Sequence, residues 1–259
     1  MSRRSGSHAA RAPESHVQPT PPDATNAPTF TRQPRRLGVA QTVRAAIRDP
    51  IHALKTALAL GRGYRCRAFA RLRGVRFRAG RNLRIYGSLS VKGPGEIIFG
   101  DDVCVIGDAT PWTYSPNARL VVGNRVMMGS ARFGCVQEIT IGDDAILAEV
   151  SIADTDFHST WANRHSDSAP IRVAPVHVGR NAWLGQASAL LPGASIGENS
   201  TVSYGAVCMR AFPANVIIIG NPAKVAAPIP SGSAPGRPTD AANPEPPAAR
   251  QPRSSKPGL

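Results

Sequence analysis

Aliphatic residues recur at every sixth position through the C-terminal half of the chain. The residue four places after each of them is small, and a glycine often follows the aliphatic residue directly. A period of six fits neither the 3.6-residue repeat of an α-helix nor the alternation of an amphipathic strand. The clearest aliphatic positions are Val178, Leu184, Leu190, Ile196 and Val202, and the small ones are Ala182, Ser188, Ala194, Ser200 and Ala206.

The hexad repeat predicts a solenoid in which short flat strands alternate with turns. The aliphatic and the small residue of each hexad then both point inward, and three hexads close one triangular coil. Coils stack at the spacing of neighbouring strands, about 4.8 Å. With one-residue slips, the pattern extends upstream to inward positions at Phe99, Val105, Val122, Met128, Ile141, Leu147 and Ala153 and to small positions at Ala145 and Ser151.

The rest of the chain falls into segments of different amino-acid composition. Residues 1–36 and 231–259 are rich in Ser, Pro and Ala with few large apolar residues, which predicts disorder. Residues 37–73 are rich in Ala, Leu and Arg. They predict a short helix that stops before Pro50, a second helix that begins on Pro50, and the basic stretch "YRCRAFARLRG". We therefore expect a basic helical segment at 37–73 and a solenoid domain at 74–230, between two disordered tails.

The positive charge is concentrated in one segment. Between residues 30 and 84 there are 14 arginines and Lys55 against Asp49 alone, whereas residues 85–230 hold 9 basic and 12 acidic residues. The segment could be a solvated helix, an amphipathic element on an anionic membrane, or a cover for the open end of the solenoid. Nucleic acid is not expected as a partner, because no recognition motif accompanies the charge and aromatic residues are few.

Other features favour a cytoplasmic protein. No apolar run approaches the roughly 20 residues of a membrane span, and the polar N-terminus lacks the core of a secretory signal. The four cysteines are scattered without a Cys-x-x-Cys pair, which suits reduced thiols better than disulfides or a zinc site. We expect a cytoplasmic location, with peripheral contact at the inner membrane face as an open alternative.

The stretch "SIADTDFHST" breaks the hexad rule, and a polar, irregular stretch follows it until the repeat resumes at Val178. His158 therefore lies at the last corner before a protruding loop. A lone histidine here could simply be a hydrogen-bonded surface residue, but an unperturbed pKa near 6.5 also suits a general base. Asp154 and Asp156 could orient its ring, with Asp156 preferred, or could cap the turn.

The segment "VHVGRNAWLGQASALLPGASIGENSTVSYGAVCMRAFPANVIIIGNPAKV" resembles the C-terminal signature of the hexapeptide-repeat acyltransferases. The resemblance covers roughly residues 75–228 and implies an all-β solenoid, a left-handed parallel β-helix. Within this family, "DTDFHST" followed by a loop and "VGRNAWLG" looks most like the sugar O-acetyltransferases of surface-polysaccharide and lipopolysaccharide assembly. The tails and the basic segment lie outside the match.

The resemblance implies roles for particular residues. His158 would be the general base, with Asp156 as its partner. Acetyl-CoA would be a co-substrate, with no permanently bound cofactor, in a homotrimer whose sites lie between subunits. Its pantetheine arm maps near Trp183, Gly185, Ala187, Ser203 and Gly205, and its phosphates map near Arg210 and Lys224. Trp183 could instead pack at a subunit face, and "GNPAKV" could be only a chain-exit turn.

We therefore expect an acetyl-CoA-dependent O-acetyltransferase acting on a sugar hydroxyl of a surface glycan or glycolipid precursor. The alternatives are an N-acetyltransferase acting on an amino-sugar nucleotide and a non-catalytic, membrane-associated scaffold. No metal is expected, because His158, His165 and His177 lie seven and twelve residues apart. The γ-class carbonic anhydrases, which share the fold, use a histidine pair five residues apart. His177 is interpreted as structural and His165 as a loop residue near the acceptor.

Overall fold

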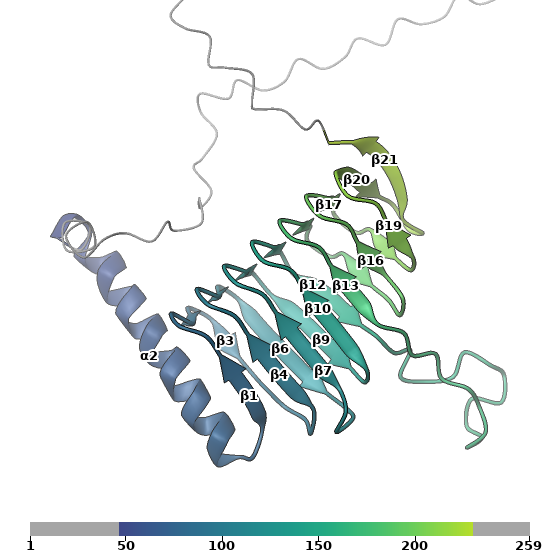
Figure 1. The fold of residues 1–259 in the computed structure, drawn as a ribbon, viewed down its shortest axis with the longest axis horizontal. Coiled ribbons are helices and arrows are strands. Elements are labelled where there is room, and N and C mark those ends of the chain that lie inside the picture. Colours follow the sequence, from purple (N-terminus) through teal and green to yellow (C-terminus); the bar gives the residue numbers. More distant parts are fainter. Residues whose placement is uncertain (1–46, 230–259) are drawn as a thin grey trace, which may run out of the picture.

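The computed structural model describes residues 47–229, which form a parallel β-solenoid with one long helix at its N-terminal end (Figure 1). The predicted β-helix of hexapeptide repeats is confirmed. The predicted disordered tails, 1–36 and 231–259, and most of the helix predicted before Pro50 lie outside the described residues. No helix within 47–229 is long and apolar enough to cross a membrane.

Three sheets form the walls of the solenoid, and the chain visits sheets A, B and C in turn. Sheet A holds β1 (Arg76–Ala79), β4 (Glu96–Phe99), β7 (Arg119–Val122), β10 (Glu138–Ile141), β13 (Val176–Val178), β16 (Ser195–Ile196) and β19 (Ala211–Phe212). Sheet B holds β2 (Arg84–Ile85), β5 (Cys104–Val105), β8 (Met127–Met128), β11 (Ile146–Leu147), β14 (Trp183–Leu184), β17 (Thr201–Val202), β20 (Val216–Ile219) and β21 (Lys224–Pro228). Sheet C holds β3 (Ser88–Leu89), β6 (Asp108–Thr113), β9 (Ala131–Cys135), β12 (Val150–Ala153), β15 (Ala189–Leu190) and β18 (Val207–Cys208).

Neighbouring strands within each sheet pair in parallel and come from successive coils, apart from β21, which folds back antiparallel on β20. A full coil takes 18 residues in the regular region, where His177 lies beside Ser195 and Trp183 beside Thr201. We call the turns between the sheets the A–B, B–C and C–A corners. Figure 1 shows the coils stacked in order from the helix to β21.

The hexad residues build the core as predicted. All five aliphatic positions from Val178 to Val202 are buried, and so are the five small positions from Ala182 to Ala206. The small residues allow the chain to turn at each corner without filling the interior, while the aliphatic residues of successive coils stack on one another. This continuous column supplies the apolar burial that holds parallel strands of only two to six residues together.

One upstream part of the predicted register is wrong. Val150 and Ile152 are buried, whereas Ser151 is exposed and Ala153 is only half-buried. The B–C corner between Leu147 and Ile152 is one residue shorter than the corner between Leu184 and Leu190, with which these residues pair. Because side chains alternate between the two faces of a strand, a slip of one residue exchanges the inward and outward positions.

Asparagines recur at the A–B corner because each coil needs a left-handed residue there. Asn181, Asn199 and Asn215 have φ of 55°, 57° and 60°, a region that asparagine tolerates better than most residues. Their side chains also form a ladder, since Asn181 Nδ2 donates to Asn199 Oδ1 and Asn199 Nδ2 donates to Asn215 Oδ1, both at 3.0 Å. The ladder ties the turns of successive coils together.

The helix is continuous from Pro50 to Leu72 (α2), and the expectation of separate short helices is wrong in this region. It begins at Pro50 as predicted, with the Asp49 carboxylate accepting the backbone N–H of His52 at 2.9 Å. Helix α2 packs over β1 and β2 through its small residues. At Gly63 the approach is so close that a Cβ would lie 2.2 Å from the Leu83 carbonyl oxygen. Helix α2 thus covers part of the open end of the solenoid.

Candidate functional site

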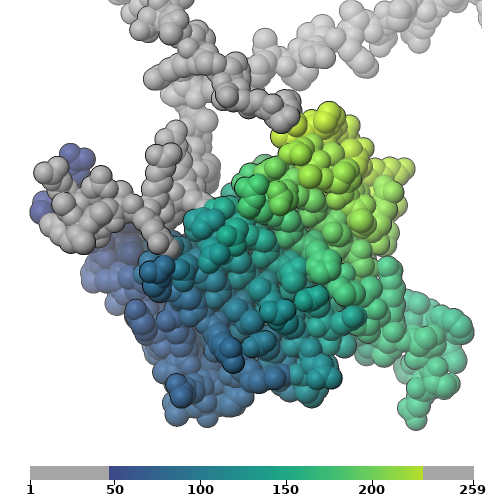
Figure 2. All heavy atoms as spheres, in the orientation of Figure 1, coloured from purple at the N-terminus to yellow at the C-terminus, as the bar shows by residue number. Residues whose placement is uncertain are grey.

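A polar loop leaves the solenoid at the C–A corner between β12 and β13. Ile139 and Val176 are neighbours in sheet A although they are 37 residues apart, about twice a regular coil. The base of the loop is closed by antiparallel pairing of Thr155 with Val173 and by hydrogen bonds from Asp156 N to Arg172 O (3.1 Å) and Ala174 N to Asp154 O (2.9 Å). Figure 2 shows the loop standing out from the body of the molecule.

His158 lies at the base of this loop, directly after Phe157, whose packing fixes the backbone there. Phe157 has a positive φ of 58°, and its ring packs edge-on against Tyr114 with the centroids 5.0 Å apart. The ring also lies over Gly134, where a Cβ would come within 2.4 Å of Phe157 Cζ. The backbone N–H of His158 donates to Asp156 O at 2.6 Å. Its side chain is exposed to solvent.

Sequence reasoning missed the contact that holds this turn in place. Phe157, Tyr114 and Gly134 lie on three different coils, and no hexad position relates them. The only signal was the glycine inside β9, because a glycine in a strand often marks a close approach of another group. Any side chain at position 134 would displace the Phe157 ring and, with it, the backbone that carries His158.

Asp154 is a structural residue of the neighbouring coil. It is fully buried, and its two carboxylate oxygens accept the backbone N–H groups of Val136 (2.8 Å), Gln137 (2.7 Å) and Glu138 (2.7 Å). Burial, reinforced by this carboxylate, raises the pKa of the Cys135 thiol to about 12, so the thiol stays protonated and donates to Asp154 Oδ2 at 3.6 Å. The carboxylate is fully occupied in holding the turn after β9.

Asp156 is half-buried and lies two residues before His158. Its backbone takes part in closing the loop, as described above, whereas the structure places no hydrogen bond between its carboxylate and the His158 ring. Within residues 47–229, the Asp156 carboxylate accepts no backbone N–H, in contrast to the Asp154 carboxylate. Its role as the partner of His158 stays a prediction.

The residues predicted to contact pantetheine gather along the B–C corner. Trp183 projects outward from β14 and is half exposed. Gly185 and Ala187 form the turn that follows, and Ser203 and Gly205 form the same turn one coil further on. The two turns are joined by hydrogen bonds from Gly185 N to Val202 O (2.7 Å) and from Gly205 N to Gln186 O (3.0 Å). We call this surface the Trp183 ridge.

The two predicted phosphate contacts lie apart from each other. Lys224 begins β21 and pairs with Ile219 at the B–C end of β20, close to the Trp183 ridge. Arg210 lies at the C–A corner between β18 and β19, with its guanidinium carbon 5.2 Å from the centroid of the Phe212 ring. Within one chain, the structure therefore brings together six of the seven predicted CoA residues and places Arg210 at another corner.

Sheet C separates the Trp183 ridge from His158. The ridge lies at the B–C corner and His158 at the C–A corner, so the width of the sheet lies between them. Strand β12 has four residues and β9 has five, which corresponds to roughly 13–17 Å at about 3.3 Å per residue. A groove of about 530 Å³ lies at the B–C end of this outer face, lined by Thr110, Arg132, Ser151 and Ala187 among others.

His177 lies in sheet A, and His165 lies in the protruding loop. His177 Nδ1 is hydrogen-bonded to Thr140 Oγ1 at 2.6 Å across neighbouring strands of sheet A, as expected of a structural residue. His165 is exposed in the loop. Within residues 47–229, no three His, Cys, Asp or Glu side chains lie close enough together to bind a metal ion.

Comparison with known proteins gives related sequences and folds. No protein-family model matches the chain. A "putative acetyltransferase" of Saccharomyces cerevisiae is 45% identical over 51 residues, which is 20% of this chain and 26% of that protein. A "putative colanic acid biosynthesis acetyltransferase" of Escherichia coli is 29% identical over 163 residues, which is 62% of this chain and 74% of that protein. The chain thus spans about a quarter of the former relative and three quarters of the latter.

Among solved structures, an N-acyltransferase of Bacillus cereus in complex with dTDP and 3-hydroxybutyryl-CoA superposes with a TM-score of 0.50 at 15% identity. The match covers 62% of this chain and 87% of that one, and it concerns the fold. Fold and repeat together define a hexapeptide-repeat β-solenoid. In its repeat and in its sequence, the chain resembles the acetyltransferases above.

Proposed function

We propose that this protein transfers an acetyl group from acetyl-CoA to a sugar hydroxyl of a surface glycan or glycolipid precursor. The observation that carries the proposal is the anchored turn that presents His158 at the base of the protruding loop, on a solenoid related to acetyltransferases. The Escherichia coli relative, which is named for colanic acid biosynthesis, supports a polysaccharide precursor as the acceptor.

In the proposed reaction, the neutral imidazole of His158 removes the proton of the acceptor hydroxyl as the oxygen attacks the thioester carbonyl carbon. The resulting oxyanion is stabilised by a backbone N–H group. When the tetrahedral intermediate collapses, the carbon–sulfur bond breaks and the imidazolium gives its proton to the departing thiolate of CoA. The sugar leaves as an acetyl ester. Asp156 would orient the ring and stabilise the imidazolium through the second nitrogen.

Acetyl-CoA would lie along the Trp183 ridge, where small residues leave the backbone of successive turns accessible. Lys224 would meet a phosphate at the end of the ridge, and Arg210 could bind one bidentately. Because His158 and the ridge lie at opposite ends of sheet C, a complete site is most simply formed by the His158 corner of one subunit and the ridge of another. This arrangement supports the expected trimer, in which Arg210 would face the CoA of a neighbouring subunit.

The decisive test is replacement of His158 by alanine in the full-length protein. We expect kcat for acetyl transfer to fall about a hundredfold or more, the usual scale for loss of a general base. Thermal stability should be unchanged because the side chain is exposed. His52→Ala, which removes another exposed histidine far from the loop, is the matched control. Undiminished turnover by His158→Ala would remove His158 from the mechanism, whereas absence of acetyl transfer by the wild type would favour the non-catalytic scaffold.

The acceptor can be identified by mass spectrometry of surface glycans from cells with and without the protein. An acetyl ester is lost on mild alkaline treatment, whereas an acetamide survives it. Loss of an alkali-labile acetyl group in the absence of the protein would support O-acetylation. Loss of an alkali-stable group would favour the alternative, an N-acetyltransferase acting on an amino-sugar nucleotide.

We further propose a cytoplasmic protein that touches the anionic inner face of the membrane through helix α2. Outside its contact with the solenoid, this helix exposes large apolar residues, namely Ile51, Leu54, Leu58 and Leu72, at 56–83% of their surface. Basic residues flank them, and each basic residue near an anionic bilayer contributes about 1 kcal/mol. Apolar side chains among cations are typical of helices that lie in the membrane interface.

Vesicle sedimentation tests this contact. The protein should sediment with anionic vesicles but not with neutral ones, and high salt should release it because exposed charges are screened. Leu54→Ser with Leu58→Ser should weaken sedimentation, whereas Ile106→Ser, which removes an exposed apolar side chain from the solenoid, should not. Equal sedimentation of all the variants would show that the apolar side of α2 does not enter the membrane.

A further inference from the structure

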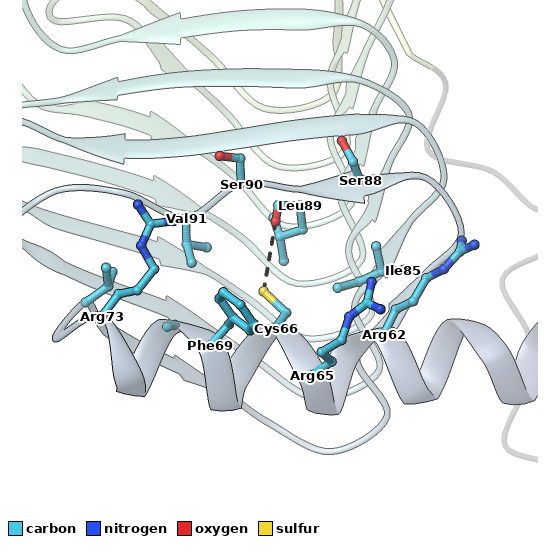
Figure 3. Close-up of a pocket in the computed structure, with 12 residues that line it drawn as sticks. Arg62, Arg65, Cys66, Phe69, Arg73, Ile85, Ser88, Leu89, Ser90 and Val91 are labelled. Carbon is cyan, nitrogen blue, oxygen red and sulfur yellow. Dashed lines mark hydrogen bonds between the residues drawn. The ribbon is translucent and has the colours of Figure 1, made fainter.

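A groove of about 560 Å³ runs between helix α2 and the edge of sheet C (Figure 3). It exists because α2 packs over β1 and β2, while β3 is left as the outermost strand of sheet C. Leu89 and the following Val91 form one wall, and Phe69 forms the other. In Figure 3, Phe69 and Cys66 point up from the helix toward Leu89 and Val91.

Charge and apolar surface are separated within this groove. Arg62 and Arg65 lie at one end, Arg73 lies at the other, and no acidic residue is among the lining side chains. Between the two ends the lining is apolar apart from Ser88 and Ser90. Phe69 exposes 59% of its surface there, which is a large exposure for a phenylalanine that could have been buried against the solenoid.

The guanidinium groups are available for a ligand. Arg62 Nη1 donates to the Tyr86 carbonyl oxygen at 2.6 Å, which holds the side chain at the rim while most of its donors stay unused. Within residues 47–229, neither Arg65 nor Arg73 forms an ion pair. Arg62 and Arg65 are three residues apart on the helix, so their side chains lie on neighbouring positions of the same face.

We propose that this groove binds one anionic phospholipid, with its phosphate between Arg62 and Arg65 and part of an acyl chain along Phe69, Leu89 and Val91. Guanidinium groups suit phosphate oxygens because they offer paired donors. A soluble phosphate compound would leave the apolar wall unused, and a neutral apolar ligand would leave the arginines unused. The proposal deepens the membrane contact proposed above, but it concerns a single bound lipid and can be tested without a bilayer.

Cys66 provides a reporter inside the groove. Its side chain is half-buried and lies beside Phe69, whereas Cys104 on β5 is also half-buried but lies outside the groove. In the full-length protein, the rate of alkylation of each thiol by iodoacetamide can be followed by mass spectrometry. Burial raises the pKa of both thiols, so the reaction is best run at mildly alkaline pH.

The probe is dihexanoyl-phosphatidylglycerol at a concentration below micelle formation. We expect it to slow alkylation of Cys66 at least fivefold and to leave Cys104 unchanged. Dihexanoyl-phosphatidylcholine and inorganic phosphate should give little protection, because the first lacks net negative charge and the second lacks the acyl chains. Equal protection by phosphatidylcholine, or by inorganic phosphate alone, would overturn the proposal.

Variants of α2 test the predicted place of the phosphate. Arg62→Gln with Arg65→Gln should abolish the protection of Cys66. Lys55→Gln with Arg71→Gln removes the same charge from the same helix outside the groove and should retain the protection. If both pairs behave alike, the lipid responds only to the overall charge of the helix, and the proposed site is wrong.

Two further outcomes would overturn the proposal in favour of a protein occupant. If Cys66 is not alkylated in the absence of lipid but becomes reactive when the protein is diluted, a second copy of the chain occupies the groove. If Cys66 is not alkylated at any protein concentration, the chain's own residues 1–46 occupy it. Two separate measurements test the proposals on which this one rests: acetyl transfer to a soluble acceptor, and sedimentation of the Leu54 and Leu58 variants. If the groove binds no lipid, these two results still show whether the proposed function and the membrane contact hold.

Discussion

Replacing Asp154 by alanine should destabilise the solenoid rather than act on the chemistry of His158. The Asp154 carboxylate is completely buried and accepts three backbone N–H groups at 2.7–2.8 Å. Alanine would leave all three donors without an acceptor in a turn between two coils. The variant therefore separates two interpretations of this residue, a partner of His158 and a brace for the turn after β9.

The size of the effect follows from these hydrogen bonds. A hydrogen bond to a charged group contributes about 1.5–3 kcal/mol. Water that enters the space left by the carboxylate would satisfy some of the donors, so we expect a net loss of about 3–5 kcal/mol. For a domain of this size, each kcal/mol corresponds to roughly 2–4 °C in Tm. The melting temperature of Asp154→Ala should fall by at least about 6 °C.

Urea and thermal unfolding, followed by circular dichroism, measure this loss. Asp154→Asn should lie between the wild type and alanine, because its amide oxygen can replace one carboxylate oxygen while its NH₂ group opposes a backbone N–H. The matched control is Asp156→Ala, two residues away and only half-buried. It should change Tm by less than about 2 °C while lowering kcat.

A result that would refute this reasoning is an Asp154→Ala protein with wild-type Tm and a strongly reduced kcat. Asp154 would then act on His158, and the hydrogen bonds to the turn would contribute little to stability. The reasoning would also be wrong if Asp156→Ala lowered Tm by several degrees while Asp154→Ala did not. The stability of the loop base, rather than that of the turn after β9, would then depend on a carboxylate.

Two further predictions concern the helix and the cofactor. Gly63→Ala should lower Tm markedly, since the added Cβ would lie 2.2 Å from Leu83 O. Gly61→Ala, where a Cβ would meet nothing within 4 Å, should raise the free energy of unfolding by about 0.5–1 kcal/mol. A Gly63→Ala protein as stable as the wild type would show that α2 does not pack closely on the first coil. Arg210→Ala and Lys224→Ala should each raise KM for acetyl-CoA more than they lower kcat, because phosphate contacts lie far from the reacting carbon. An unchanged KM in steady-state assays of both variants would contradict the proposed place of the nucleotide.

The sequence was sufficient wherever structure depends on a short repeat. A hexad specifies which residues point inward without reference to distant parts of the chain, so Leu184 and Ala194 could be assigned to the core from spacing alone. The loop that carries His158 was visible for the same reason, as an interruption of that spacing. The prediction failed at Ser151 and Ala153, where the corner is one residue shorter than the corresponding corner of the next coil.

Parts of the candidate site could not be predicted, because they depend on contacts between residues with no regular spacing. Phe157 meets Tyr114 and Gly134 only because three coils are stacked in register. Beside the preferred Asp156, Asp154 was also a candidate partner of His158 in the linear sequence. In the folded chain its carboxylate turns toward the preceding coil, where backbone amides without other acceptors surround it.

By itself, then, the sequence determined the solenoid, the extent of its core and the position of the interrupting loop, because each follows from a period that is repeated locally. Only the tertiary structure decided that α2 runs unbroken across the first coil, that His158 and the Trp183 ridge lie at opposite ends of sheet C, and that a groove remains beside β3. These features arise where different coils, or the helix and a coil, meet. Their geometry depends on close packing between segments that the repeat does not relate.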